Sequence, residues 1–165
     1  MHASHPLVHQ SVHFKLKDEE ASCELARRMA SFLSPPLIMA FSGDLGAGKT
    51  TLIRAMLRAL GVTGAIKSPT FSLVESYDLP RGGGVHHFDL YRILEEAELD
   101  DMGFRDYFSS DALCCIEWPE RSAQVLSSAD LLCSIQIQET QRDVTIDALS
   151  ALGARFLSSF LEATG

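Results

Sequence analysis

Hydrophobic positions follow two different periods along the chain, and the change between them predicts where strands give way to helices. Residues 37–41 form an apolar run that is typical of a strand. After a short glycine-rich stretch, apolar residues return at positions 52, 53, 56, 57 and 60, which is the spacing of one helix face. The pattern therefore predicts a strand, a loop and a helix in that order.

The same patterns predict further elements on both sides of this unit. Residues 18–33 have acidic residues in their first turn and are followed by Pro35 and Pro36, which is typical of a helix that stops there. Residues 71–89 contain two β-rich segments joined by PRGGG and predict an antiparallel hairpin. The remaining expected elements are an acidic helical segment at 95–108, a buried strand at 112–117, a terminal hairpin within 131–149 and an amphipathic helix at 151–163.

Length and composition limit the organisation of the chain. It has 165 residues, of which 46% are hydrophobic, and this is enough for one domain with a proper core. We expect a single domain over residues 1–165, with 1–12 as a flexible tail. No apolar run is long enough to cross a bilayer, and the start MHASHPLVHQ lacks the pattern of a secretion signal, so we expect a cytoplasmic protein without membrane contact.

Charge and cysteine usage narrow the classes of partner and cofactor. The formal net charge is −8 and the sequence pI is about 5.1, so the surface as a whole should repel a nucleic acid backbone. Any RNA involved in the function should be held mostly by other proteins. The four cysteines show no C-x-x-C spacing, and we interpret them as buried thiols without a metal or a disulfide.

The glycine-rich stretch between the expected strand and helix carries the strongest chemical signal. Its sequence, GDLGAGKTT, fits the phosphate-loop pattern G-x-x-x-x-G-K-[ST]. Glycines let successive backbone N–H groups face phosphate oxygens at the positive end of the following helix. The lysine adds a mobile charge, and the next hydroxyl is suited to ligate magnesium. The candidate phosphate-binding residues are Gly43, Asp44, Leu45, Gly46, Ala47, Gly48, Lys49, Thr50 and Thr51.

A plain glycine-rich turn that only starts a helix is the alternative interpretation of this stretch. The strand before it and the helix after it favour the phosphate loop, because the mechanism requires both. The sequence therefore predicts a single-domain P-loop NTPase of the α/β class, with a mixed central sheet flanked by helices.

Phosphate-loop enzymes also need an acidic residue at the end of a neighbouring strand to hold magnesium, directly or through water. Asp89 ends the segment VHHFD and Glu117 ends ALCCIE, and the residues alone do not choose between them. Thr70, in the segment SPTF, is either a switch hydroxyl that senses the outer phosphate or an ordinary strand residue. His86 and His87 should point to opposite faces of a strand, which argues against a shared metal.

The segments GDLGAGKTT, KSPTFSLVESY, HFDLYRI, MGFRDYF and IEWPE occur in an order that resembles one family, the TsaE (also called YjeE) ATPases of bacterial tRNA threonylcarbamoyladenosine synthesis. The resemblance runs from about residue 18 to residue 120, and more loosely through the terminal hairpin. It implies a small ATPase that uses ATP and Mg²⁺. It also implies two partners, TsaD and TsaB, which place threonylcarbamoyl on a tRNA adenosine and which this subunit resets between turnovers.

The resemblance also assigns roles to individual residues. The loop from Gly43 to Thr51 would bind the phosphates, with Lys49 at the reacting phosphate, while Thr50 and Glu117 would hold magnesium. Asp89 would lie beside the nucleotide and the attacking water, and Thr70 would be the switch hydroxyl. More weakly, the resemblance implies that two further residues approach the nucleotide, namely Glu19 and Arg142.

Two other functions remain open from the residues. A small-molecule P-loop kinase needs an acceptor pocket and usually an arginine-bearing lid, and no R-x-x-R lid cluster occurs here. A nucleotide-dependent switch with negligible hydrolysis would share the same loop. Turnover in the presence of partners separates the switch from an ATPase.

Overall fold

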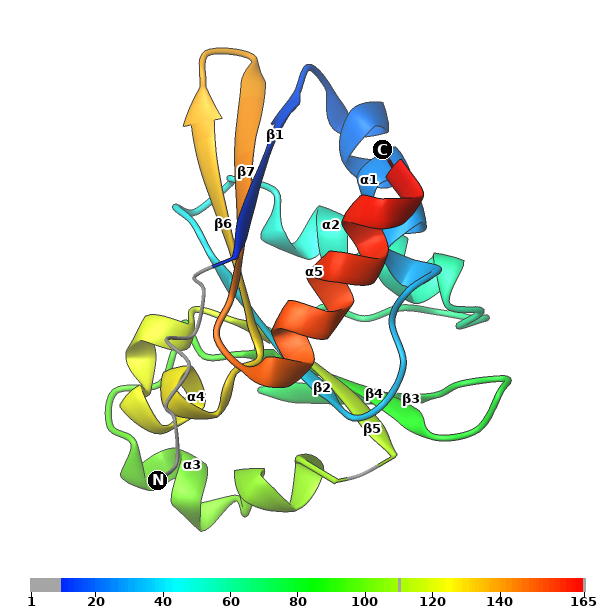
Figure 1. The fold of residues 1–165 in the computed structure, drawn as a ribbon. Coiled ribbons are helices and arrows are strands. Elements are labelled where there is room, and N and C mark those ends of the chain that lie inside the picture. The colour runs from blue at the N-terminus through cyan, green and yellow to red at the C-terminus, as the bar shows by residue number, and fades with distance from the viewer. Residues whose placement is uncertain (1–9, 110, 165) are drawn as a thin grey trace, which may run out of the picture.

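A seven-stranded mixed sheet runs through the protein in the computed structural model, which describes residues 10–109 and 111–164 (Figure 1). The strand order is β1-β7-β6-β2-β5-β4-β3. The four central strands β6, β2, β5 and β4 are parallel to one another, and antiparallel partners complete both edges. The strands are β1 (Ser11–Leu16), β2 (Leu37–Ser42), β3 (Val74–Asp78), β4 (Gly84–Asp89), β5 (Ala112–Glu117), β6 (Leu131–Gln138) and β7 (Gln141–Ala148).

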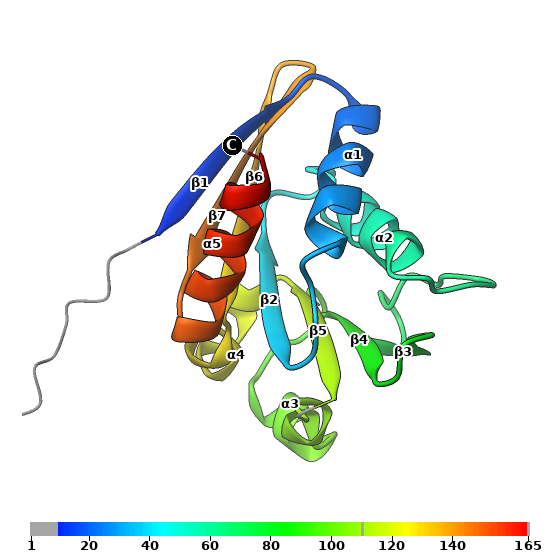
Figure 2. The same ribbon diagram turned by 45° about the vertical axis from the view of Figure 1, so that its right-hand side comes forward.

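Helices cover both faces of the sheet (Figure 2). On one face α1, α2 and α5 share a core with β2, β6 and β7, and on the other face α3 and α4 pack against β4 and β5. Burying both faces explains why β2 and β5, at the centre of the sheet, are nearly continuous apolar runs, and every side chain of β5 is buried. The helices are α1 (Glu19–Ala30), α2 (Lys49–Ala59), α3 (Ala97–Asp101), α4 (Ala123–Ser128) and α5 (Ala151–Thr164).

Local sequence accounts for the limits of the helices that flank the glycine-rich loop. The Asp18 carboxylate caps α1 by accepting a hydrogen bond from the backbone N–H of Ala21 at 2.8 Å. Gly48 precedes α2 with φ of +106°, a left-handed conformation that a residue with a side chain rarely adopts. The chain can therefore turn sharply from β2 into α2.

Most of the expected elements are present, and the terminal and 71–89 hairpins are antiparallel as predicted. The acidic segment differs from the expectation, because it forms the short α3 and a 3₁₀ turn at Phe104–Tyr107. The two are separated by Gly103, whose φ is +70°. The short α4 was not predicted.

The amino-terminal strand β1 is a correction to the tail expected at 1–12. Residues 11 and 12 belong to β1, where they pair with Asp147 and Ile146 of β7. Gln10 also accepts a backbone hydrogen bond from Ala148, and the remainder of the expected tail, residues 1–9, lies outside the described residues. The pattern of β1 is only half-buried, and its pairing partner lies more than a hundred positions away in the sequence, so local signals did not identify it.

Three of the four cysteines are buried in strands, as predicted, and the expectation of burial is wrong for the fourth, Cys23. Burial raises the pKa of Cys114 and of Cys133 to about 12, so both remain protonated at neutral pH. Cys23 on α1 is only partly buried. None of the helices in residues 10–109 and 111–164 combines the length and apolar character that a membrane span requires.

Candidate functional site

Three parallel strands end at the same edge of the sheet, next to the glycine-rich loop. In the register of the sheet, Glu117 at the end of β5 lies beside Phe41 of β2 and beside Asp89 at the end of β4. The loop leaves β2 directly after this point. The carboxyl ends of parallel strands are where α/β proteins bind ligands, so the topology brings both candidate acids to the phosphate loop.

The loop contains three glycines whose positive φ angles would strain a larger residue. Gly43 has φ of +156°, and a Cβ atom added there would lie 2.6 Å from the carbonyl oxygen of Ile135. At Gly46 and Gly48 the φ angles are +82° and +106°, and a Cβ would meet nothing within 4 Å. Open space beside the backbone is what a phosphate group needs for close approach.

Lys49 begins α2, and its amine lies over the loop. The ammonium group donates to the carbonyls of Gly43 and Asp44 and sits 4.0 Å from the centre of the Trp118 ring. Burial lowers the pKa of Lys49, and the nearby carboxylate of Glu117 opposes that shift.

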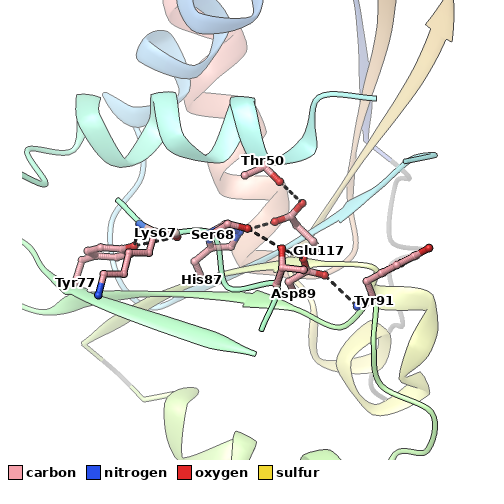
Figure 3. Close-up of polar contacts among 9 residues, drawn as sticks. Thr50, Lys67, Ser68, Tyr77, His87, Asp89, Tyr91 and Glu117 are labelled. Carbon is pink, nitrogen blue, oxygen red and sulfur yellow. Dashed lines mark hydrogen bonds and ion pairs between the residues drawn. The ribbon is translucent and has the colours of Figure 1, made fainter. Parts of the chain in front are cut away.

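The hydroxyl of Thr50 and the carboxylate of Glu117 form a direct pair, shown in Figure 3. Thr50 Oγ1 donates to Glu117 Oε1 at 2.8 Å, and Glu117 Oε2 lies 2.7 Å from Nε2 of His87. Glu117 is 3% exposed and His87 is fully buried. The carboxylate is therefore held on both oxygens, with one contact from α2 and one from β4.

Asp89 and Thr70 also lie within hydrogen-bonding distance of each other. Figure 3 shows Asp89 beside Tyr91 and Glu117. Asp89 accepts hydrogen bonds from the backbone N–H of Tyr91 at 3.0 Å and from the Thr70 hydroxyl at 3.4 Å. The Thr70 oxygen is 2.7 Å from that of Ser68. Burial raises the pKa of Asp89, the hydrogen bond from Tyr91 opposes this, and the charge of Glu117 adds to it.

These groups surround a cavity of about 430 Å³. Its lining contains the loop from Leu45 to Thr51 together with Thr70, Asp89, Glu117 and Trp118. A larger cavity of about 530 Å³ lies between the carboxyl ends of α1 and α2 and the β3–β4 turn, and neither acid lines it. Volume alone would favour the larger cavity, but the phosphate loop and the two carboxylates line the smaller one.

Glu19 and Arg142 lie on the other side of the loop. Both line a cavity of about 230 Å³ that also includes Gly46, Gly48 and Thr51. Arg142 Nε donates to the carbonyl of Ala47 at 3.0 Å, so the terminal hairpin contacts the loop directly. The structure thus places both residues beside the loop, in a separate cavity from Asp89 and Glu117.

His87 is the residue of this site that the sequence interpretation missed. The expectation that His86 and His87 face opposite sides is confirmed, because His87 is buried with Glu117 whereas His86 contacts Ser76 and Tyr107. The only signal in the sequence was the position of His87, two residues before Asp89 on the same strand face. A contact with Glu117 requires the register of β4 and β5.

The oxygen donors at the strand ends suit magnesium. Mg²⁺ prefers hard oxygen ligands, takes only one or two carboxylates and completes its shell with waters and phosphate oxygens. Thr50 supplies a hydroxyl and Glu117 a carboxylate, and Asp89 is the neighbouring acid. Within the described ranges, no group of three or more His, Cys, Asp or Glu side chains could hold a metal alone. The residues present therefore fit magnesium bound jointly with phosphate oxygens.

The phosphate loop between β2 and α2, with acids at the ends of neighbouring parallel strands, defines an α/β protein of the P-loop NTPase class. A family model described as "Threonylcarbamoyl adenosine biosynthesis protein TsaE" matches residues 16–145. The chain therefore belongs to the TsaE family, whose members are named for tRNA threonylcarbamoyladenosine biosynthesis.

Individual relatives agree with this assignment. The chain is 39% identical over 150 residues to the tRNA threonylcarbamoyladenosine biosynthesis protein TsaE of Haemophilus influenzae, covering 88% of this chain and 94% of that protein. It is 32% identical over 134 residues to the Bacillus subtilis protein of the same name, covering 79% and 81%. The crystal structure of Bacillus subtilis YdiB superposes with a TM-score of 0.77 at 22% identity, covering 95% and 98% of the two chains, and shows the same fold.

Proposed function

We propose that this protein is the ATP-binding and ATP-hydrolysing subunit required for threonylcarbamoyladenosine modification of tRNA. It acts on a complex of TsaB and TsaD proteins and resets that complex between turnovers. Family membership supports the pathway, and the arrangement of the site supports the chemistry. The observation that carries the proposal is the contact between Thr50 and Glu117 beside the phosphate loop.

The proposed roles follow from where each group lies. The backbone from Gly43 to Thr51 binds the phosphates of ATP at the amino end of α2, where N–H groups and the helix dipole favour anions. Lys49 moves from the loop carbonyls to the outer phosphates, because a phosphate offers the buried ammonium group a charged acceptor. Thr50 and Glu117 hold the magnesium ion. When bound, the ion neutralises charge that develops on the outer phosphates.

Asp89 is proposed to orient the attacking water beside the outer phosphate. It lies next to Glu117 in the register of the sheet and lines the same cavity as the loop. The Thr70 hydroxyl of the SPTF segment donates a hydrogen bond to Asp89. If the outer phosphate displaces Thr70, Asp89 loses this hydrogen bond, and the SPTF segment thereby responds to the phosphate. Glu19 and Arg142 are proposed to contact the nucleotide from the cavity of about 230 Å³ on the other side of the loop.

The net charge of −8 supports a division of labour with other proteins. An acidic surface gains nothing from a tRNA backbone, so the proposed subunit reaches tRNA only through TsaB and TsaD. Dependence on partners also predicts weak hydrolysis by the isolated chain.

The test measures magnesium-dependent ATP hydrolysis by the isolated chain and in the presence of TsaB and TsaD from the same organism. We expect the rate of ATP hydrolysis to rise when the partners are present. The rate of the Lys49→Ala variant should fall by at least about 100-fold, because the variant lacks a positive charge at the reacting phosphate. Lys15→Ala, at an exposed position on β1, is the matched control and should remain active. Turnover of Lys49→Ala at the unmodified rate would overturn the phosphate-loop assignment, and hydrolysis unaffected by partners would overturn the partner role.

A further inference from the structure

His87 is a fully buried polar side chain, and its one hydrogen bond within residues 10–109 and 111–164 goes to Glu117, the candidate magnesium ligand. Its Nε2 lies 2.7 Å from Glu117 Oε2, and neither side chain is more than 4% exposed. The other ring nitrogen, Nδ1, is buried and has no hydrogen-bond partner in the part of the chain that the structure describes. Burial removes the contacts of the imidazole ring with water, and the hydrogen bond to Glu117 replaces them. The role of the side chain therefore lies in that hydrogen bond.

The hydrogen-bond pattern around Glu117 fixes which group donates. Glu117 Oε1 already accepts from the Thr50 hydroxyl, and an ionised carboxylate has acceptors only. The ring nitrogen facing Oε2 must therefore carry the hydrogen. A neutral ring with hydrogen on Nε2 leaves a lone pair at the unpartnered Nδ1, whereas a hydrogen there would be a buried donor without an acceptor, which costs more.

We propose that His87 is a positioning residue, which holds the Glu117 carboxylate by an Nε2–H hydrogen bond in the orientation that pairs with Thr50 and receives magnesium. The inference rests on the proposed function for its metal. The geometry explains why the bond is directional: β4 and β5 are hydrogen-bonded neighbours, and His87 lies beside Cys115, two residues before Glu117 on the same face. The ring thus approaches Glu117 along the sheet while Thr50 approaches from the helix above it.

Loss of the donor has a definite expected effect. Without it, Oε2 of a buried carboxylate lacks its hydrogen bond, and the side chain can rotate away from Thr50. Outer-shell partners of this kind typically change metal affinity by about 10- to 100-fold. The effect should fall on the magnesium-linked part of nucleotide binding and spare the binding that needs no metal.

The experiment compares His87→Leu, which removes the donor, with His87→Gln, whose side-chain amide places an N–H near the position of Nε2. Calorimetry measures ADP affinity without magnesium and across a magnesium titration. We expect His87→Leu to weaken apparent magnesium affinity by about 10- to 100-fold while metal-free ADP affinity stays nearly constant, and His87→Gln to restore most of the loss. His86→Leu, the neighbour on the opposite face, is the matched control and should behave as the unmodified protein.

A second measurement does not depend on how well a variant folds. Nitrogen-15 chemical shifts of the histidine rings in the unmodified protein show which nitrogen of His87 carries hydrogen. Hydrogen on Nε2 supports the inference, and hydrogen on Nδ1 alone overturns it.

The outcomes also separate this inference from the proposed function. If the unmodified protein binds ADP with magnesium and His87→Leu retains the same magnesium dependence, the inference alone is overturned. The same holds if His87→Leu and His87→Gln lose metal-free and magnesium-linked affinity equally, since that is a general structural loss. If the unmodified protein binds no ADP under either condition, the proposed function is overturned and this inference with it.

Discussion

At the scale of single residues, two ionisable side chains of the site carry charge in surroundings that disfavour it. Burial lowers the pKa of Lys49 and raises the pKa of Asp89, and in both cases burial is the largest cause. Both shifts favour the neutral form, so the folded protein without nucleotide loses stability by keeping these groups charged. Phosphate oxygens and a metal ion supply opposite charges, which is why such shifts gather at binding sites.

Asp89→Asn should therefore stabilise the fold at neutral pH while it removes function. The amide keeps an acceptor for the N–H of Tyr91 and has no charge to bury. A carboxyl whose pKa is raised in the folded state adds stability below its unfolded pKa and loses it as pH rises through the folded value. The stability advantage of the variant should thus grow as pH rises above about 4 and then level off.

Chemical denaturation of both proteins from pH 4 to pH 8 measures this difference. Partner-stimulated ATP hydrolysis of Asp89→Asn should fall by roughly 100-fold or more, because the water loses its acceptor. A variant that is less stable than the unmodified protein at pH 8 would contradict the assigned cost of burying the charge.

At the scale of elements, the start of α5 is fitted tightly against the start of β6. The Asp130 carboxylate accepts hydrogen bonds from the backbone N–H of Ile38 at 2.8 Å and from the Ser150 hydroxyl at 2.6 Å. It thereby ties β2, β6 and the first turn of α5 together. Gly153 in that turn approaches so closely that an added Cβ would overlap the carbonyl oxygen of Asp130.

Gly153→Ala should therefore destabilise the protein, although glycine to alanine inside a helix ordinarily stabilises by about 0.5–1 kcal/mol. The obstacle is a backbone atom, which cannot turn aside as a side chain can. We expect a loss of about 1–3 kcal/mol in the free energy of unfolding, measured by urea titration. Ser159→Ala, at an exposed position of the same helix, should stay within about 0.5 kcal/mol of the unmodified protein. Equal stability of Gly153→Ala and the unmodified protein would show that α5 can shift.

At the scale of the whole molecule, the SPTF segment connects the cavity beside the phosphate loop to the outer surface. Thr70 faces Asp89 within the cavity, while its neighbour Phe71 is 87% exposed and lies against Arg92. Under the proposed function, a change at the outer phosphate would therefore reach an exposed surface that is open to a partner protein. Such coupling must be reciprocal, because binding free energies are linked.

Thr70→Ala should weaken this coupling without weakening ADP binding. In the unmodified protein we expect a non-hydrolysable ATP analogue to change affinity for the TsaB–TsaD complex by about 5- to 150-fold relative to ADP. Loss of the Thr70 hydroxyl removes the contact to Asp89, so that ratio should move toward one. Ser72→Ala is the matched control, since Ser72 bonds only to the side chain of Glu75 in the described contacts.

Calorimetry of the complex with ADP, with the analogue and without nucleotide measures the ratio. Equal affinities in all three conditions for the unmodified protein would rule out the switch. A normal ratio in Thr70→Ala would leave a switch that does not use this hydroxyl.

The sequence by itself determined what depends on neighbouring residues. The phosphate loop with its flanking strand and helix, both hairpins and the closing helix could be predicted because their signals are periodicity, capping and turn residues within a few positions. The acids at the ends of β4 and β5 were identified for the same reason, since each follows an apolar run directly.

Only the tertiary structure decided which distant residues meet. β1 pairs with β7, and His87 contacts Glu117 across 30 positions, because strand order and register place them together. A shift of one residue in the pairing of β4 with β5 would turn His87 to the other face, and no local signal specifies that register. Burial of both sheet faces sets it: Cys115 and Val85 belong to one core, and Cys114 and Phe88 to the other. The orientation of Glu117 is therefore a consequence of core packing, while its identity as a candidate ligand was already readable along the chain.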